Sequence, residues 1–393
     1  MSSTSRPRVL FLGNVFPVPA DDGTKIRIRN LVEAVATVAD VDVFTLYGPD
    51  DPLGTAADLG VARLGGVPRN RAWRPRSPLR WPASSLPRPW ASRDVSAARE
   101  ALSAFTRGSY DLVWYCRVET FLTFGPVPAS RRLLDVDVLE GERIATSVEA
   151  GKGSPLRTFA AFVDRARWRR LERRVVDAVD VAFVCSDADR RRLGGDGVVV
   201  VPNGYEEARS LPAVTSEHPT VGFVGSFAYG PNVDAARVLV EDVMPRVRAR
   251  VPQARLLLVG RRGDELFGVD RPDWVEATGY VDEVEPWLAR IDVMAVPIRY
   301  GGGTRIKILE ALCHRIPLAA YRYAVAGIDV ADGVHAHLVE DAEGLAAAVV
   351  ALLEDADAAA RLAEAGRRLF EERYRWGAIR TQVAGLVADL VQR

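Results

Sequence analysis

Residues 291–320 combine a glycine-rich loop with charged side chains at the start of a predicted helix, and apolar runs flank them on both sides. The loop contains three consecutive glycines, and Arg305, Lys307 and Glu310 follow it. Backbone amides at a helix start attract phosphate, and glycines let a ligand approach the backbone closely. A carboxylate on the same helix can accept hydrogen bonds from sugar hydroxyls. The combination predicts a site for a nucleotide sugar.

The cations Arg305 and Lys307 are candidates for both catalysis and donor binding. A departing nucleotide diphosphate develops negative charge, which preorganised cations stabilise. Residues two apart on a regular helix point to different faces, however. If Thr304 caps the helix and Arg305 remains in the loop, both side chains can reach the diphosphate; otherwise Arg305 alone does. The alternative is a solvated helix start with surface cations.

Glu310 is the strongest single site prediction. A surface glutamate on an ordinary amphipathic helix is the alternative, but neighbouring apolar residues such as Ile308 and Leu309 leave its face less exposed. A partly buried carboxylate needs hydrogen-bond donors, and two vicinal ribose hydroxyls supply them.

Strand-like apolar runs alternate with helical patterns along the whole chain, which predicts an α/β fold with parallel sheets covered by helices. The first unit begins with a strand at 8–14 and a helix near 25–38. A polar segment containing proline precedes a second unit, which opens at 220–226. Ligands in such sheets bind beyond the carboxyl ends of the strands, so the loops after these strands should form the site.

At these residues the chain resembles the GT-B glycosyltransferases, and within them the retaining GT4-like enzymes, also called glycosyl transferases group 1. The resemblance is carried by Glu310 and the strand after it, where the family has the second glutamate of a Glu-x7-Glu motif. Gly302 stands where the first glutamate is expected, so the group that contacts the transferred sugar is replaced by a segment of glycines with Arg and Lys.

The resemblance implies two doubly wound, Rossmann-like domains that face each other across a cleft. The acceptor-side domain would be 1–205, with the final helix 376–393 packing back on it; 206–219 would be the linker and 220–375 the donor-binding domain. Donor contacts are then expected from loop residues after the strands and before the helices, namely Gly23, Gly225, Ser226, Gly260, Arg261, Tyr280, Val281, Gly302, Gly303 and Thr304, beside Arg305, Lys307 and Glu310.

Two of these expectations have open alternatives. Gly23 precedes a helix and resembles the family's glycine loop, with Lys25 or Arg27 as secondary candidates, but an ordinary βα turn has the same sequence. Asp135 and Asp137 follow an apolar strand where relatives present a polar residue near the acceptor, so either could orient or deprotonate the acceptor hydroxyl. An acidic turn at a strand end is the alternative.

Two arginine-rich stretches need separate interpretations. Residues 69–93 mix Arg, Trp and Pro without periodicity, which indicates a long solvated loop that could also touch a membrane or the acceptor. Residues 165–174 carry Trp168 and Leu171 at helical spacing, and Val175 continues the series, which predicts one amphipathic helix with a basic outer face.

Composition narrows the remaining possibilities. The 393 residues contain 52 Lys and Arg against 52 Asp and Glu, so nucleic acid is not an expected partner, and membrane contact is possible but not indicated. Cys116, Cys185 and Cys313 have no metal-like spacing, and the start of the chain lacks a secretory pattern, so a cytoplasmic protein without metal or cofactor is expected.

The sequence therefore predicts a metal-independent glycosyltransferase that moves a sugar from a nucleoside diphosphate sugar to an acceptor hydroxyl or amine. The resemblance implies retention of configuration and a natural-product or exopolysaccharide pathway, with a small molecule or saccharide as acceptor. Two alternatives remain: a non-catalytic nucleotide-sugar-binding protein, motivated by Gly302, and a GT-B epimerase or phosphorylase.

Overall fold

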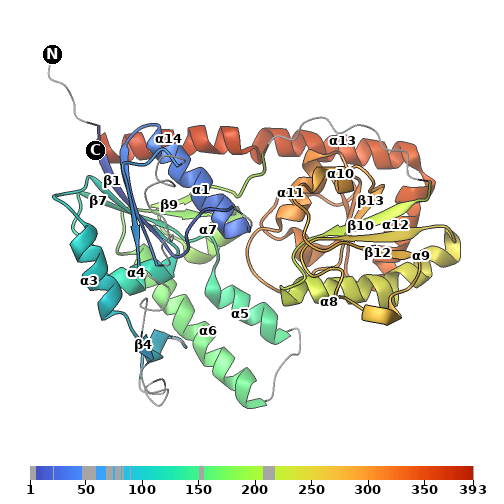
Figure 1. Cartoon of the computed structure of the whole chain (residues 1–393), viewed down its shortest axis with the longest axis horizontal. Helices are drawn as coiled ribbons and strands as arrows, with labels where there is room; N and C mark the ends of the chain where they lie inside the picture. The colour runs from blue at the N-terminus through green and yellow to red at the C-terminus, as the bar shows by residue number, and fades with distance from the viewer. Residues whose placement is uncertain are drawn as a thin grey trace. The chain divides into compact units, whose positions relative to one another are not determined.

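The computed structural model describes residues 6–20, 22–46, 59–67, 74–75, 81, 84–88, 90–149, 155–206 and 217–392. Most of the predicted linker at 206–219 and much of the segment 69–93 lie outside these ranges. The chain divides into two compact units, the first being Met1–Asn203 with Trp376–Arg393 and the second Gly204–Arg375. Figure 1 shows the elements of both units.

The first unit contains a parallel sheet of seven described strands in the order β3-β2-β1-β6-β7-β8-β9. Its central strands consist of consecutive buried apolar residues, as strands covered on both faces require. The strands are β1 (Arg8–Gly13), β2 (Asp40–Thr45), β3 (Arg63–Gly66), β6 (Leu112–Cys116), β7 (Arg131–Asp135), β8 (Val181–Val184) and β9 (Val198–Val200). A short antiparallel pair, β4 (Arg74–Pro75) and β5 (Arg93–Asp94), lies outside this sheet.

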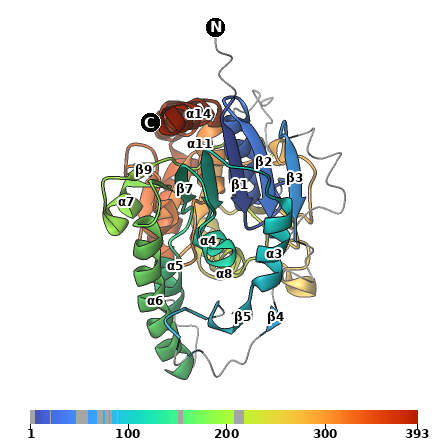
Figure 2. The same ribbon diagram turned by 90° about the vertical axis from the view of Figure 1, so that its left-hand side faces the viewer.

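Helices cover both faces of this sheet, and two separate apolar clusters fill the spaces between helices and strands. Figure 2 shows the long α6 beside α5 on one side of the sheet. The helices are α1 (Gly23–Ala36), η2 (Trp90–Ser92), α3 (Ser96–Phe105), α4 (Val118–Phe124), α5 (Glu140–Glu149), α6 (Pro155–Val176), α7 (Asp187–Leu193) and α14 (Trp376–Gln392).

The last helix, α14, packs on the first unit although it is last in sequence. Its buried residues recur at helical spacing, with Trp376, Ile379, Val383 and Val387 in the same apolar cluster as α1. Arg380 also donates a hydrogen bond to Oδ1 of Asn30 on α1. The final helix therefore completes the core of the first unit.

The second unit contains a parallel sheet of six strands in the order β12-β11-β10-β13-β14-β15. The strands are β10 (Thr220–Val224), β11 (Arg255–Val259), β12 (Val275–Ala277), β13 (Val293–Val296), β14 (Leu318–Tyr321) and β15 (His337–Val339). Around them lie α8 (Gly230–Val238), the π-helical turn η3 (Leu239–Val243), α9 (Met244–Arg250), η4 (Gly268–Asp270), α10 (Glu285–Leu288), α11 (Ile306–Cys313), η5 (Arg322–Val325), α12 (Ala342–Glu354) and α13 (Ala356–Arg373). The prediction of two α/β units with parallel sheets is confirmed.

Because all pairs in the second sheet are parallel, the carboxyl ends of its strands meet at one edge. The loops after β10, β11, β12 and β13 start at this edge, and α11 follows the last of them. The edge is the position at which doubly wound sheets bind ligands.

Candidate functional site

Two glycines bring the loops after β10 and β11 into backbone contact. Gly225 has φ 152° and Gly260 has φ 133°, conformations that residues with a side chain rarely adopt. A Cβ atom on Gly260 would lie 2.4 Å from the carbonyl oxygen of Gly225. The Gly260 N–H donates to Oγ1 of Thr278 over 3.0 Å, which joins the loop after β12 to the same edge.

The ammonium of Lys307 lies directly behind the Gly225 turn. Its Nζ donates to Oδ1 of Asn232 over 2.7 Å and lies 4.0 Å from the centroid of the Phe223 ring. A Cβ on Gly225 would come within 2.7 Å of this Nζ atom, so a side chain at this position would displace the cation. Burial lowers the pKa of Lys307 to about 7; Glu310 opposes the shift and the nearby Arg305 adds to it.

Arg305 precedes α11 and belongs to the loop, with φ −83° and ψ 93°. Thr304 is therefore not the N-cap, because the cap position is Arg305 itself, and no side chain caps the helix. The guanidinium lies 4.6 Å from the Tyr323 ring centroid, and Nη1 donates to the Gly303 carbonyl over 2.9 Å. Its Nη2 atom is buried without a hydrogen-bond partner among the described residues. Arg305 and Lys307 are therefore not forced onto different faces of one helix, because Arg305 lies outside the helix.

Glu310 follows Lys307 by three positions on α11, so the two side chains share one face. Burial raises the pKa of Glu310 to about 7; Lys307 counteracts the rise and Glu285 adds to it. The two opposite charges therefore support each other at the start of α11. A carboxylate held above its ordinary pKa gains from hydroxyl donors, which hydrogen-bond to its charged form.

The other predicted donor residues lie in the loops of this edge. Ser226 and Arg261 are exposed, Tyr280 is exposed above the guanidinium of Arg261 at 5.6 Å, and Val281 is half-buried. Gly302 and Gly303 are half-buried, and Gly303 has φ 77°. These placements agree with a loop-built site, and the donor role of each residue stays a prediction.

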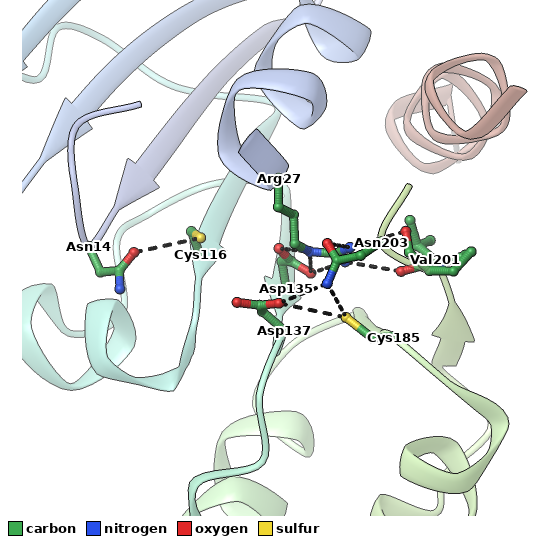
Figure 3. Close-up of polar contacts among 9 residues, drawn as sticks. Asn14, Arg27, Cys116, Asp135, Asp137, Cys185, Val201 and Asn203 are labelled. Carbon is green, nitrogen blue, oxygen red and sulfur yellow. Dashed lines mark hydrogen bonds and ion pairs between the residues drawn. The ribbon is translucent and has the colours of Figure 1, made fainter. Parts of the chain in front are cut away.

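In the first unit, Arg27 and Asp135 form a bidentate ion pair inside the protein (Figure 3). Nη2 lies 2.6 Å from Oδ1 and Nε lies 2.9 Å from Oδ2, and neither side chain is exposed. Burial alone would lower the pKa of Arg27, but Asp135 outweighs it and the pKa is raised. The interpretation of Arg27 as a phosphate ligand is therefore wrong, and Asp135 is not placed to receive an acceptor proton, because both charges are used inside the unit.

Asp137 differs from Asp135 in its backbone and its partners. Its φ is 53°, in the left-handed region that few residues other than glycine adopt, and 9% of the residue is exposed. Asn203 Nδ2 donates to its Oδ1 over 3.3 Å, and the Cys185 thiol donates to the same oxygen over 3.7 Å (Figure 3). Burial raises the pKa of Cys185, which keeps it a thiol. Of the two aspartates predicted near the acceptor, only Asp137 retains solvent-accessible surface.

Gly23 is the first residue of α1, and Asp22 caps this helix. The Asp22 carboxylate accepts from the Lys25 amide over 3.0 Å. A carboxylate already occupies part of this helix start, which makes it less attractive to phosphate than the start of α11. The donor role of Gly23 stays a prediction.

Asn232, Asn203 and Tyr323 each hold a candidate residue of their own unit in a way that the sequence pattern does not indicate. Asn232 fixes Lys307, Asn203 joins Arg27 to Asp137, and Tyr323 lies over Arg305 and donates to the Gly301 carbonyl. Asn203 directly follows a strand and a proline in VVVVPNG, which was a visible sign. The distant contacts could not be read from spacing.

The described part of the chain contains neither a metal-binding cluster nor a membrane-spanning helix. No group of three or more His, Cys, Asp or Glu side chains there could hold a metal ion. Within the same residues, no helix combines the length and apolar character needed to cross a bilayer.

Part of the chain matches a known protein family. Residues 218–355 match the family model described as glycosyl transferases group 1. Over 272 residues the chain is 26% identical to a phosphatidyl-myo-inositol mannosyltransferase of Mycolicibacterium smegmatis. The aligned region covers 66% of this chain and 68% of that protein.

Solved structures resemble the whole chain. Sucrose-phosphate synthase of Thermosynechococcus elongatus has a TM-score of 0.71 at 22% identity and covers 98% of this chain and 100% of its own. TarM has a TM-score of 0.69 at 10% identity, and the match covers 100% of both chains. HepE of Anabaena, in complex with UDP-glucose, has a TM-score of 0.62 at 16% identity, and the match covers 97% of this chain and 99% of that chain. Residues 218–355 thus match the model of group 1 glycosyl transferases, and the chain as a whole has the GT-B fold.

Proposed function

We propose that this chain transfers a sugar from a nucleoside diphosphate sugar to an acceptor hydroxyl or amine, with retention of configuration and without a bound metal. As a GT4-like enzyme it would act in natural-product or exopolysaccharide biosynthesis. The nucleotide of the donor is proposed to be UDP in the first instance, because the HepE structures with a similar fold contain UDP-glucose or UDP.

The single observation that carries the proposal is the pair of cations at the carboxyl edge of the second sheet. Lys307 is 8% exposed beside the Gly225 turn, and Arg305 has a buried Nη2 donor without a partner among the described residues. The two cations repel each other, since Arg305 contributes to the lowered pKa of Lys307. A diphosphate between them would remove the repulsion and accept the unused hydrogen bond.

In the proposed reaction the bond between the anomeric carbon and the diphosphate oxygen breaks, and the acceptor oxygen or nitrogen forms the new bond to that carbon. Arg305 and Lys307 stabilise the negative charge that develops on the leaving diphosphate. Glu310 accepts hydrogen bonds from the ribose hydroxyls and orients the nucleotide. The acceptor proton passes to a phosphate oxygen of the donor, so the donor itself supplies the base.

Asp137 is proposed to orient the acceptor group from the first unit. Its carboxylate is held by Asn203 and Cys185, so its position is fixed by packing and not by a flexible surface loop. A fixed carboxylate lowers the cost of aligning the acceptor with the anomeric carbon.

The experiment incubates purified protein with UDP-glucose, GDP-mannose, ADP-glucose and dTDP-glucose, and follows nucleoside diphosphate release together with the anomeric proton of the sugar by NMR. The proposal predicts release from one donor, accelerated by a panel of sugar and alcohol acceptors, with the equatorial anomeric proton of the α-linked donor still equatorial in the product. Release with inverted configuration would contradict retention.

A non-catalytic nucleotide-sugar-binding protein is a second candidate, favoured by Gly302 in place of the first glutamate. This candidate predicts binding of one donor with no release of nucleoside diphosphate at any protein concentration. Release above the spontaneous rate, abolished in Arg305→Ala, would exclude it.

A further inference from the structure

Helix α6 separates its residues into two contrasting faces. Trp168 and Val175 are buried against the first unit, together with the carboxylates of Asp164 and Glu172. Asp164 accepts from Nε1 of Trp81 over 2.9 Å and from Nε of Arg88 over 2.8 Å, and Glu172 accepts from the Gly141 amide. Both acidic residues of the helix therefore face inward and are used by internal partners.

The opposite face of α6 carries aromatic and cationic side chains, with the small Ala166 between them. Phe159 and Phe162 are 68% and 65% exposed, the largest exposed fractions given for any large apolar side chain among the described residues. Arg170 and Arg173 continue the same stripe two to three turns further along, because the spacing of 3, 8 and 3 residues keeps all four on one side of a 3.6-residue helix.

No acidic side chain lies within the stripe itself. Between residues 158 and 174 the exposed side chains include no carboxylate; the exposed Asp177 follows one turn after Arg173, just beyond the end of α6. Arg170 and Arg173 form no ion pair with another described residue. Arg169, which borders the stripe, pairs with Glu142 of α5 at 2.6 Å. The views in Figures 1 and 2 agree that α5 and α6 lie side by side and extend away from the sheet.

We infer that this face of α6, defined by Phe159, Phe162, Arg170 and Arg173, binds the surface of an anionic lipid bilayer. Apolar aromatic groups beside cations, with no acid between them, match the boundary between acyl chains and anionic headgroups. Exposing two phenylalanines to water is unfavourable, and insertion into the headgroup boundary removes that cost. The stripe runs along the helix, so α6 would lie in the plane of the interface and not cross it.

Charge complementarity favours a bilayer over the other two partners that such a face could bind. A nucleic acid would use the arginines, yet the two phenylalanines sit one turn apart at the end of the helix that lacks these arginines. A second copy of this chain would bring two cationic stripes together, and like charges oppose that contact. An anionic bilayer satisfies both kinds of side chain at once.

The test is co-sedimentation of the full chain with vesicles of phosphatidylcholine containing phosphatidylglycerol, or of phosphatidylcholine alone. The parent protein is expected to bind only the anionic vesicles, and less as salt increases. Arg170→Glu with Arg173→Glu should lower the partition coefficient by about tenfold or more, because the change removes two cations that an anionic surface attracts and adds two anions that it repels. Phe159→Ser with Phe162→Ser should lower it to a similar degree.

A matched control is Arg190→Glu with Arg191→Glu on α7, which makes the same change in net charge at two other exposed arginines of this unit. The control should bind like the parent, and circular dichroism and nucleotide binding should be unchanged in all three variants, since none touches the donor site.

Three results would overturn the inference: no binding of the parent to anionic vesicles, equal loss in the α7 control, or unchanged binding of both α6 variants. If the parent does not bind vesicles but binds single-stranded RNA, and the arginine variant loses this binding, the face belongs to a nucleic acid. If the parent does not bind vesicles but forms a dimer, and the phenylalanine variant loses the dimer, the face binds a second copy of the chain.

Discussion

The Lys307 ammonium donates a 2.7 Å hydrogen bond to Oδ1 of Asn232, so a residue of α8 holds a cation of α11 at the carboxyl edge of the second sheet. The amide is itself fixed, because Asn232 Nδ2 donates to the Ser226 carbonyl over 2.8 Å. The cation is therefore placed before any ligand arrives, and its pKa is lowered to about 7, chiefly by burial. A nucleotide diphosphate would reverse that shift.

Proton uptake is expected when the donor binds. At pH 8 most Lys307 side chains are neutral and Glu310, with a pKa of about 7, is mostly ionised. A bound diphosphate raises the pKa of Lys307, so up to one proton enters the site. Calorimetry of a nucleoside diphosphate sugar in two buffers of different ionisation enthalpy measures this uptake, and the donor affinity should fall as pH rises from 7 to 9. Lys307→Met should bind more weakly and lose the uptake; an uptake that persists in this variant would assign it to another group.

Substituting Gly225 by alanine should damage the donor site without a general loss of folding. The new Cβ would lie 2.7 Å from Nζ of Lys307 and 2.8 Å from Nδ2 of Asn232, at φ 152°. We expect the donor KM to rise by about tenfold or more, since a displaced cation loses roughly 1.5 kcal/mol or more of charge-assisted bonding. Gly333→Ala is the control, because its φ is 70° and nothing lies within 4 Å of the added atom. Equal effects of both variants would attribute the change to backbone strain alone.

Asp137→Asn should lower kcat by about 100-fold if this carboxylate orients the acceptor. Asparagine has the same shape and tolerates the left-handed backbone at φ 53°, so the fold should survive and the donor KM should change little. Asp196→Asn, at an exposed loop position of the same unit, is the control. An unchanged kcat in Asp137→Asn would remove this residue from the reaction.

Asp135→Asn should destabilise the first unit by about 3–5 kcal/mol, because it leaves the Arg27 guanidinium buried without its counter-charge. Urea unfolding gives the free energy. Arg27→Met with Asp135→Leu should recover most of the loss, since an apolar pair of similar volume needs no desolvation. Asp180→Asn, which breaks the surface pair with Arg131 at 3.1 Å, should cost less than about 1 kcal/mol. A similar cost for both single variants would contradict the buried-pair account.

The two-unit α/β architecture followed from sequence because long apolar runs such as those of β1, β6, β10 and β11 belong to strands buried on both faces. The edge strand β3 was missed, since RLGG is short, half-exposed and contains two glycines that weaken any strand pattern. The spacing at 165–174 predicts a helix with a basic outer face, and the structure contains this helix. The helix begins earlier than predicted, at Pro155, so the sequence pattern does not reveal the exposed Phe159 and Phe162 as part of it.

The candidate site was predictable where residues are close in sequence and not where the fold joins distant ones. Arg305, Lys307 and Glu310 follow one loop, and their grouping could be read directly. Arg27 lies 108 positions from Asp135, and only the sheet brings them together, so a buried structural cation resembled a loop phosphate ligand. If Thr304 were the N-cap, helix α11 would begin at Arg305, but it begins at Ile306. Arg305 therefore belongs to the loop.

The most direct test of the account is the affinity of UDP, GDP, ADP and dTDP for the parent protein, Arg305→Ala and Arg255→Ala, measured by calorimetry at one salt concentration. Arg255 is exposed at the opposite end of the same sheet, so its loss should leave the affinity unchanged. The account predicts that one nucleotide binds and that Arg305→Ala weakens it by about tenfold or more, as expected for a charge-assisted contact with phosphate. Equal affinity of all three proteins for that nucleotide would contradict the diphosphate site at Arg305 and Lys307.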